Sequence, residues 1–454
     1  MAKQWKLLIL SIAMCLTVSP AFTQEEESAP EFGLDLGLGA ATYNELSDDR
    51  LTTEQVTYQS LSLSPDFAIG PFGIGVAITL NYRFTGGDGS EFELRSADWI
   101  PSEEVSFLEL YLPLFRYIRW GQRGEPLYIK LGSIDDATLG NGFIMGNYSN
   151  THFLPDTRIF GLMFDLDGQL FNFPLVGLQS FVGNLATFDV MGARLYTRPL
   201  VFLQVPIIQF LEVGASIVAD RDPYAFVEAT ESNPISVWGI DFKLPILSNP
   251  IISLVAFGDF VSQNEHTGGM IGFAGKLFSF LPYGAQLRIL GDDFIPVYFG
   301  EPYDLFRAQY YAIATNPTTS EPIIDSTAGW FANTGLSILD GLISFSISFD
   351  GPFVKPARDI LDTDDDAWVN YPHLRGSFVL AEGLVPGLWL NASLDKRNIQ
   401  TFADLIDFSD AVIGLTINYK TGPAVLTLAY DVRFNPVTEE WETSAKLQSS
   451  LSLF

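Results

Sequence analysis

A run of thirteen residues, FGIGVAITLNYRF at positions 72–84, alternates strictly between two kinds of side chain. Large apolar residues occupy every second position, and glycine, alanine, threonine, asparagine and arginine stand between them. Successive side chains of a β-strand point to opposite faces of a sheet, so one face of this strand is apolar and the other is small or polar. Strands of soluble sheets are usually about 5 to 6 residues long, whereas a strand tilted across a membrane needs about 9 to 11. The run favours a membrane strand over a long strand of a soluble all-β protein.

The order of side chains along this run supports the same interpretation. Phe72, Tyr82 and Phe84 stand near its ends, and aliphatic residues fill the middle of the apolar row. Aromatic rings favour the two interfaces of a membrane, and aliphatic side chains favour its centre. We therefore expect residues 72–84 to cross a bilayer as one strand of a β-barrel.

Similar alternation recurs along the chain, in residues 160–167, 238–244, 343–350 and 388–394. Long polar connections broadly alternate with short links rich in proline and glycine, such as the hairpin signal Asp340-Gly341. We count about 20 candidate strands, within a range of 16 to 22, and an even number suits an antiparallel sheet that closes on itself. One barrel over residues 32–454 accounts for the chain without a second domain.

The first 23 residues have the pattern of an export signal. Lys3 and Lys6 precede an apolar stretch over residues 7–18, and small residues follow near Ala21 and Thr23. Cleavage after either Ala21 or Thr23 fits, and residues 24–31 then form a short acidic segment. Cys15 is the only cysteine, so the exported chain has no disulfide bond and no cysteine-based site.

Hydrophobic residues make up 47% of the sequence, but beyond residue 23 they are spread out rather than gathered into a run long enough for a membrane helix. The formal net charge is -29, and loss of Lys3 and Lys6 with the leader makes it more negative. Such an acidic chain is disfavoured as a nucleic-acid binder. Only 17% of residues are charged and 14% are aromatic, which excludes a disordered acidic protein.

With its export signal, cysteine-free mature chain, long alternating strands and terminal Phe454, the sequence resembles the bacterial outer-membrane β-barrel class, porins included. The resemblance implies a single antiparallel transmembrane barrel with short periplasmic turns and long extracellular loops. It also implies outer-membrane lipids and the barrel-insertion machinery as partners, with Phe454 as the aromatic residue that this machinery recognises. Leu447, Leu451 and Leu453 depart from the class pattern, because they lie on the parity opposite to the usual one.

Motifs for catalysis and for metal or cofactor binding are weak in this sequence. His152, His266 and His373 lie far apart in polar stretches, and we expect solvated loop residues rather than metal ligands. Ser149 stands close to His152, but a hydrolase would need a third member and an oxyanion donor that the sequence does not supply. We expect no enzymatic activity and no cofactor.

Two polar connections contain unusual residues. One includes Asp362, Asp364, Asp365 and Asp366, which are weak candidates for calcium because the spaced glycine and final glutamate of an EF-hand are missing, so a solvated loop is favoured. The other contains the apolar run 143–145. It predicts either a loop folded into the barrel or a tip that is exposed or contacts another protomer.

The function that this pattern predicts is a passive outer-membrane channel for small hydrophilic solutes. A barrel of this width leaves an aqueous lumen unless something plugs it. An adhesin or structural barrel and a transporter of hydrophobic substrates remain as alternatives, and a homo-oligomer is left open. The side chains that parity directs into the lumen are Thr79, Asn81, Arg83, Lys130, Asp165, Arg194, Glu212, Asp241, Lys243, Asp259 and Arg288.

Net charge also predicts a weak preference for cations. Charged residues are excluded from the lipid face, so the excess acids must lie in loops and lumen and make the mouth negative. The basic lumen candidates oppose this locally, and the field of the loops is screened beyond about 8 Å at physiological salt.

Overall fold

The computed structural model describes residues 31–46, 53–85, 91–102, 105–153, 158–203, 205–227, 233–278, 280–339, 341–354, 372–397, 399, 401–407, 411–422, 424–435 and 440–452. The predicted export signal with Cys15, most of the acidic segment 24–31, Asp340, the acidic cluster Asp362 to Asp366 and Phe454 lie outside these residues. Their assignments stay predictions.

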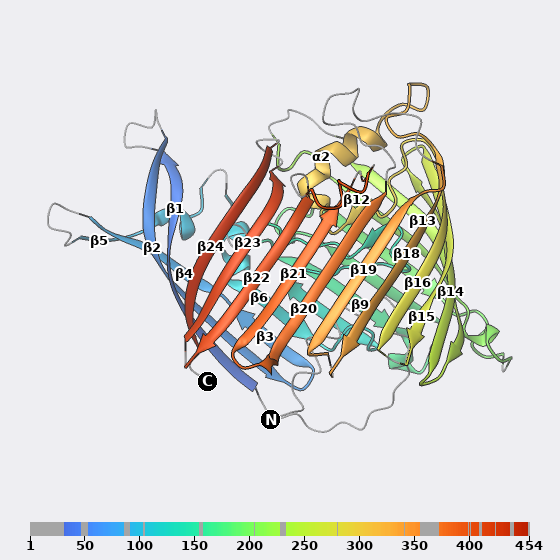
Figure 1. Ribbon diagram of the computed structural model, residues 1–454, viewed down its shortest axis with the longest axis horizontal. Coiled ribbons are helices and arrows are strands. Elements are labelled where there is room, and N and C mark those ends of the chain that lie inside the picture. Colours follow the sequence, from blue (N-terminus) through green and yellow to red (C-terminus); the bar gives the residue numbers. More distant parts are fainter. Residues whose placement is uncertain are drawn as a thin grey trace.

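A single antiparallel sheet of 22 strands dominates the fold (Figure 1). Its strands are β1 (Glu31–Leu46), β2 (Thr53–Ile69), β3 (Phe72–Val76), β4 (Ile78–Thr85), β5 (Glu91–Leu94), β6 (Phe115–Trp120), β7 (Leu127–Gly132), β9 (Gly161–Asp167), β10 (Val176–Val182), β11 (Val190–Thr197), β12 (Glu212–Asp220), β13 (Ile235–Ser248), β14 (Ile252–Gln263), β15 (His266–Leu277), β16 (Leu281–Leu290), β18 (Thr327–Ile338), β19 (Ile343–Pro352), β20 (His373–Val385), β21 (Leu388–Lys396), β22 (Ala411–Thr421), β23 (Ala424–Asn435) and β24 (Glu440–Ser452). The short strands β8 (Met145–Gly146) and β17 (Phe299–Gly300) form a separate pair.

The two ends of the large sheet are joined, because β1 pairs with β24 over four residues, from Asp35 with Ser452 to Leu38 with Ser449. β3 and β4 both pair with β2 and are two pieces of one interrupted strand. Within the described residues, β5 pairs with β4 and is not a member of the ring. The described residues thus form a ring of twenty strands, the number expected from the sequence. All-β antiparallel architecture is confirmed.

Connections of different length separate to the two ends of the sheet. β1 begins and β24 ends at one end, where β20 and β21 are linked by residues 386–387 and β22 and β23 by 422–423. The opposite end carries the long connections 133–160 and 291–326. Residues 262–267 are polar in sequence, but they form a tight turn between β14 and β15, in which Asn264 has a positive φ of 52°.

The expectation that residues 72–84 form one unbroken strand was wrong. The strand breaks at Ala77, and its two pieces have different second neighbours: β3 pairs with β6, whereas β4 pairs with β5. A register shift between Gly75 and Val76 accompanies the break. Periodicity could not reveal it, because both pieces keep the same parity.

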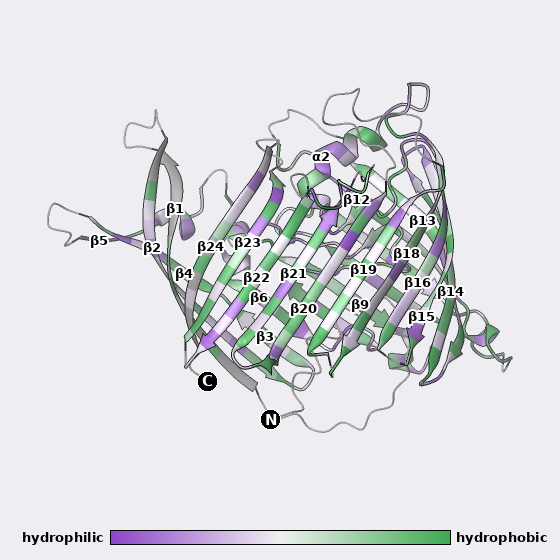
Figure 2. Cartoon of the chain, viewed as in Figure 1, coloured by the Kyte–Doolittle hydropathy of each residue, from purple (hydrophilic) through white to green (hydrophobic). Residues whose placement is uncertain are grey.

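The outer face of the sheet is apolar. Directly opposed residues of an antiparallel pair point to the same face, so the register of the strand pairs traces each face from strand to strand. Six residues on adjacent strands are between 47% and 62% exposed and lie on this face: Leu195, Ile217, Ile240, Phe260, Ile271 and Leu287. Figure 2 shows hydrophobic and hydrophilic residues alternating along β18 to β24. An exposed apolar surface of this extent is typical of contact with lipid.

Helices are few and short. They are η2 (Ser96–Asp98), α1 (Phe107–Tyr111), η3 (Leu112–Leu114), η4 (Gly168–Phe171), η5 (Ile208–Phe210) and α2 (Tyr303–Ala314). Among the described residues, none of these helices is long and apolar enough to cross a membrane.

Candidate functional site

Two long connections fold inward and pack against each other. Residues 133–153 and 158–160 come from the β7–β9 connection, and residues 291–326 come from the β16–β18 connection; together we call them the plug. They join through β8 and β17, which pair in parallel with Met145 opposite Phe299. The backbone N–H of Val297 donates to the carbonyl of Phe143 at 2.9 Å, which extends this contact. The most buried core of the molecule is therefore built by connections.

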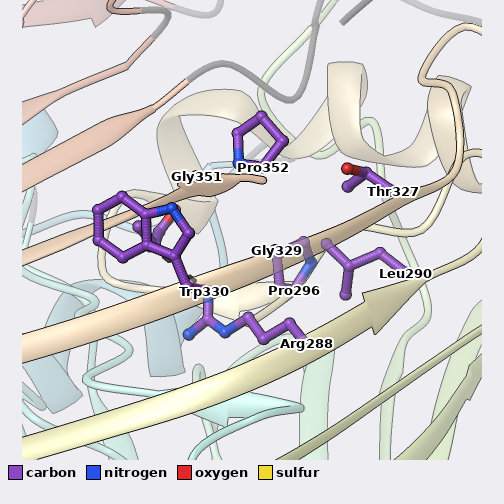
Figure 3. Close-up of a pocket in the computed structure, with 9 residues that line it drawn as sticks. Arg288, Leu290, Pro296, Thr327, Gly329, Trp330, Gly351 and Pro352 are labelled. Atoms are coloured by element: carbon purple, nitrogen blue, oxygen red, sulfur yellow. Dashed lines mark ion pairs between the residues drawn. The ribbon is translucent and has the colours of Figure 1, made fainter. Parts of the chain in front are cut away.

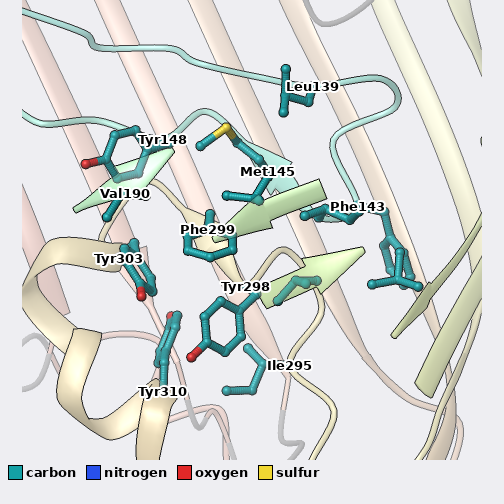
Figure 4. Packing of buried hydrophobic residues seen from close by; sticks show 14 of the residues in the cluster. Leu139, Phe143, Met145, Tyr148, Val190, Ile295, Tyr298, Phe299, Tyr303 and Tyr310 are labelled. Atoms are coloured by element: carbon teal, nitrogen blue, oxygen red, sulfur yellow. The ribbon is translucent and has the colours of Figure 1, made fainter. Parts of the chain in front are cut away.

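Apolar and aromatic side chains fill the centre of the plug (Figure 4). Phe143, Ile144 and Met145 are at most 4% exposed, which agrees with the expectation of a loop folded into the barrel and is contrary to an exposed tip. Tyr298 and Tyr303 are fully buried beside them, with ring centroids 5.6 Å apart. Burial of so many rings makes the plug a compact unit rather than a loose loop.

Hydrogen bonds tie the plug to one wall of the sheet. The Asn141 Nδ2 group donates to the Asp259 carboxylate at 2.8 Å and to the Phe242 carbonyl at 3.1 Å. The backbone N–H of Gly140 donates to Gln179 Oε1 at 3.3 Å. The β7–β9 connection is thereby held against β10, β13 and β14.

An ion-pair cluster ties α2 to the wall near the ends of β11 and β12. Arg307 is 2% exposed and donates to both oxygens of Asp220, at 2.6 Å and 2.5 Å, and to Asp189 at 2.8 Å. The Tyr303 hydroxyl donates to Asp220 at 2.6 Å. A guanidinium shared between two carboxylates in a buried site holds the helix in one orientation.

A third attachment reaches β23. Arg433 donates from Nη1 to the backbone carbonyl of His152. The His152 ring donates in turn from Nε2 to the carbonyl of Glu301 at 2.7 Å. Both plug connections are thus tied to β23 as well as to β10–β14, so the plug spans the interior between distant strands.

Three predicted lumen residues meet in one buried cluster. Arg194 donates to both oxygens of Asp241, at 2.8 Å and 2.5 Å, and to Glu212 at 3.0 Å. Arg194 and Asp241 stand on β11 and β13, and Gly214 of β12 lies between them. A Cβ atom at Gly214 would lie 2.6 Å from Arg194 Nε and 2.7 Å from the Asp241 carboxylate. Glycine therefore leaves the space in which this ion pair forms across the intervening strand.

The other predicted lumen residues are distributed around the ring rather than gathered into one site. Lys243 lies opposite Glu212 in the register, and Asp165 lies opposite Tyr128. The remaining contacts are Thr79 Oγ1 with Ser62 Oγ at 2.9 Å, Asn81 with Asp98 at 2.8 Å, Arg83 with Glu93 at 2.7 Å, Lys130 with Asp135 at 3.0 Å, Asp259 with Asn141 at 2.8 Å and Arg288 with Asp350 at 3.4 Å.

The interior face of β19 to β23 is lined mainly by small polar side chains. Ser346 and Ser377 form a hydrogen bond of 2.6 Å between adjacent strands, and Thr427 donates to Asn418 at 2.7 Å. Asn391, on the same face, is exposed. Hydroxyl and amide groups on this side of the ring form a water-compatible wall beside the plug.

A small pocket lies where β16, β18 and β19 meet the plug (Figure 3). Arg288, Trp330 and Pro296 contribute to its lining. Its volume is about 30 Å³, which accommodates about one water molecule. The pocket is too small to hold an organic solute.

The expectation of solvated loop histidines was wrong for His266 and His373, which lie in strands, and the ring of His152 is hydrogen-bonded within the plug rather than solvated. His266 is 4% exposed in β15 and its Nε2 lies 3.0 Å from the Asn316 carbonyl, while His373 in β20 lies 2.9 Å from the Asp395 carboxylate. Strand pairing extends further than the polar composition of these stretches suggested. The Ser149 hydroxyl forms a hydrogen bond of 2.7 Å with the Thr151 hydroxyl.

Sequence reasoning missed the α2 cluster and the polar group around His373. Asp220 and Arg307 belong to long polar stretches that we interpreted as connections, and no role was predicted for Asp189. Tyr303, Arg307 and Tyr310 recur at helical spacing within that stretch, which was an available signal for α2. Within the described residues, no group of three or more histidine, cysteine, aspartate or glutamate side chains is arranged to hold a metal ion.

No protein-family model matches this sequence, and no curated protein matches it. Among solved structures, the chain is similar to outer membrane protein OprD from Pseudomonas aeruginosa, with a TM-score of 0.33 and 9% identity over 94% of this chain and 95% of that one. It is also similar to Pseudomonas aeruginosa OpdL, with a TM-score of 0.32 and 9% identity over 94% of this chain and 99% of that one. For Acinetobacter baumannii OccAB4 the TM-score is 0.32 and the identity 10%, over 94% and 98% of the two chains.

Because these scores are low, we draw the function from the chain's own residues. A ring of antiparallel strands with an apolar exterior and a polar interior has the architecture of the bacterial outer-membrane β-barrel class.

The buried wall cluster makes a prediction about stability. Asp241→Ala leaves the buried Arg194 guanidinium with Glu212 and Gln179 but without its two-oxygen partner, and should lower the free energy of unfolding by about 3 kcal/mol. Glu93→Ala removes the partner of Arg83, in a pair whose side chains are 33% and 44% exposed, and should cost less than about 1 kcal/mol. Urea unfolding of the two variants measures the difference, and equal costs would contradict the burial argument.

A second prediction concerns the docking of α2 as a function of pH. Asp304 is 2% exposed, accepts from the Tyr148 hydroxyl at 3.2 Å, and burial raises its pKa from 3.8 to about 7. The docked state therefore binds this proton more tightly than the undocked state. Its contribution to docking is full below about pH 4 and is lost as the pH rises through about 7.

Thiol labelling of Ile313→Cys, a buried position on α2, measures this opening. The labelling rate, divided by that of Ser320→Cys at an exposed position, should rise between pH 5 and pH 8 and should become independent of pH when Asp304→Asn is added. An unchanged pH dependence in the Asp304→Asn variant would show that another group controls docking.

Proposed function

We propose that this chain is an outer-membrane channel for passive diffusion of small hydrophilic solutes, narrowed by the plug. The observation that carries the proposal is the polar interior face, which the strand register follows from β2 and β4 around to β23. Solutes pass beside the plug along the Ser, Thr and Asn side chains of β19 to β23. The mechanism needs no bond chemistry. Barrels with an aqueous lumen conduct in this way.

The arrangement of charges supports a weak preference for cations. Four basic lumen candidates have a carboxylate partner: Arg83 with Glu93, Lys130 with Asp135, Arg194 with Asp241 and Arg288 with Asp350. Their positive charge is largely compensated within the wall. Against this, Arg119 and Arg158 donate to neutral oxygens, those of Gly121 and Ser133 respectively. Because the net charge is -29, acidic side chains outnumber basic ones, and we expect the potential at the mouth to be negative and to favour cations.

Orientation in the membrane follows from the same proposal. Both termini of an even-stranded barrel lie on the periplasmic side, so the short turns face the periplasm and the plug enters from the outer surface. Solutes then meet the plug before they reach the turn end of the barrel.

Conductance of the purified full-length protein in a planar bilayer tests the proposal. We expect ohmic steps that increase with KCl concentration and, under a KCl gradient, a reversal potential of cation sign that shrinks at high salt because loop fields are screened. Absence of steps would favour an adhesin or structural barrel. Anion selectivity at low salt would show that the wall arginines determine selectivity.

Substitutions at a plug attachment and at a wall residue distinguish the effect of the plug on conductance from the effect of the wall. Arg433→Ala removes the tie to His152 and should increase conductance or flickering between levels. Lys420→Ala, which removes a cation near Glu382 at 3.8 Å on the turn side, is the matched control and should leave the steps unchanged. Equal effects of both variants would contradict a constriction by the plug.

A further inference from the structure

The joint between the first and last strands is incomplete. β24 pairs with β23 over twelve residue pairs but with β1 over only four, ending at Leu38 and Ser449. Beyond that point β1 continues to Leu46, paired on its other edge with β2. Figure 1 shows β1, β2 and β4 leaning away from β24 toward their loop ends.

The other edge of this group of strands, formed by β4, also leaves the ring, at a height similar to that at which the β1–β24 pairing ends. Leu63 of β2 pairs with Ile78, directly after the break at Ala77, and β4 then pairs with β5 instead of continuing along β6. Residues 39–46, 53–63, 78–85 and 91–94 therefore form a four-stranded unit that we call the flap. The Ala77 N–H donates to the Leu114 carbonyl at 2.8 Å, which fixes the base of the flap to the segment leading into β6.

Backbone chemistry makes this open joint costly in a membrane. Within the described residues, Gly39 to Leu46 have a strand partner on one edge only. Each unpaired backbone N–H or C=O in hydrocarbon costs several kcal/mol, so lipid-exposed sheet edges do not persist. An edge of this length needs a second strand.

The side chains of the flap also favour closure of the flap. The face that continues the barrel interior carries Asn81, Arg83 and Glu93, with the Arg83–Glu93 pair only partly buried. Charged groups facing hydrocarbon are expensive and are expected to face a water-filled interior. Closing the flap returns this face to the interior.

We propose that the flap closes against β24 as a lateral gate, extending the existing β1–β24 register. Continuation of that register places Ala40 opposite Leu447 and Thr42 opposite Ala445. Ala40 and Leu447 are both exposed, and their parity places them on the outer face, so they complete the apolar belt in the closed state. The closed gate seals the barrel interior from lipid, and the open gate connects the interior with the lipid.

Disulfide cross-linking tests the closed state directly, because Cys15 lies in the predicted leader and the rest of the chain has no cysteine. The test pair is Ala40→Cys with Leu447→Cys, in full-length protein in native membranes under mild oxidation. Leu36→Cys with Leu451→Cys, a pair already in register, is the positive control. Ala40→Cys with Ala445→Cys, displaced by two residues on the same face, is the register control.

The proposal predicts an intramolecular link in the test pair at a yield comparable to the positive control, and at least five-fold less in the register control. Mass spectrometry of the linked peptides identifies the bond. Failure of the test pair while the positive control links would overturn closure. Links between two chains instead would also overturn it and would identify a second copy as the partner of this edge. None of these outcomes depends on whether the barrel conducts.

Discussion

Backbone N–H and C=O groups that lie in lipid must find their hydrogen-bond partners within the protein, and this requirement determines the architecture of the sheet. A chain that crosses lipid with strands must give each strand two neighbours, because water is not there to replace a missing partner. The twenty-strand ring meets this requirement along most of its length, and β1 with β24 supplies the joint. Pairing on both edges also fixes the orientation of each strand in the ring. Alternate residues of a strand then face lipid and the interior.

Charged side chains inside the wide ring would lower its stability if they were buried without partners. Buried ions are tolerated when they are paired with good geometry, and Arg194 with Asp241 and Arg307 with Asp220 both use two carboxylate oxygens. The first pair fixes the wall, and the second fixes α2 on the wall. The aromatic centre of the plug adds apolar burial that the strands of an open ring do not supply. We propose that the rigid plug and the polar wall beside it together define the route of solutes through the barrel.

Local alternation made the sheet predictable from sequence. It indicated the strand class, the number of strands and which side chains share a face, including Arg194, Glu212 and Asp241. It could not show that Arg194 reaches Asp241, because that contact crosses a strand and depends on the missing side chain at Gly214. Nor could it show the break at Ala77, since both pieces keep their parity. The plug was only partly predictable: the apolar run at Phe143 indicated a buried loop, but Arg307 finds Asp220 through the fold, 87 residues apart in sequence.

We infer that, around the plug, one face of the sheet meets water and the other meets lipid. Spin labels placed singly at residues 390 to 394 of β21 in liposomes test this most directly, with a water-soluble nickel complex and oxygen as the two relaxing agents. We expect strict alternation, with nickel accessibility high at Asn391 and Ser393 and oxygen accessibility high at Leu390, Ala392 and Leu394. Equal accessibility of both parities to nickel, or alternation of the opposite sign, would contradict it.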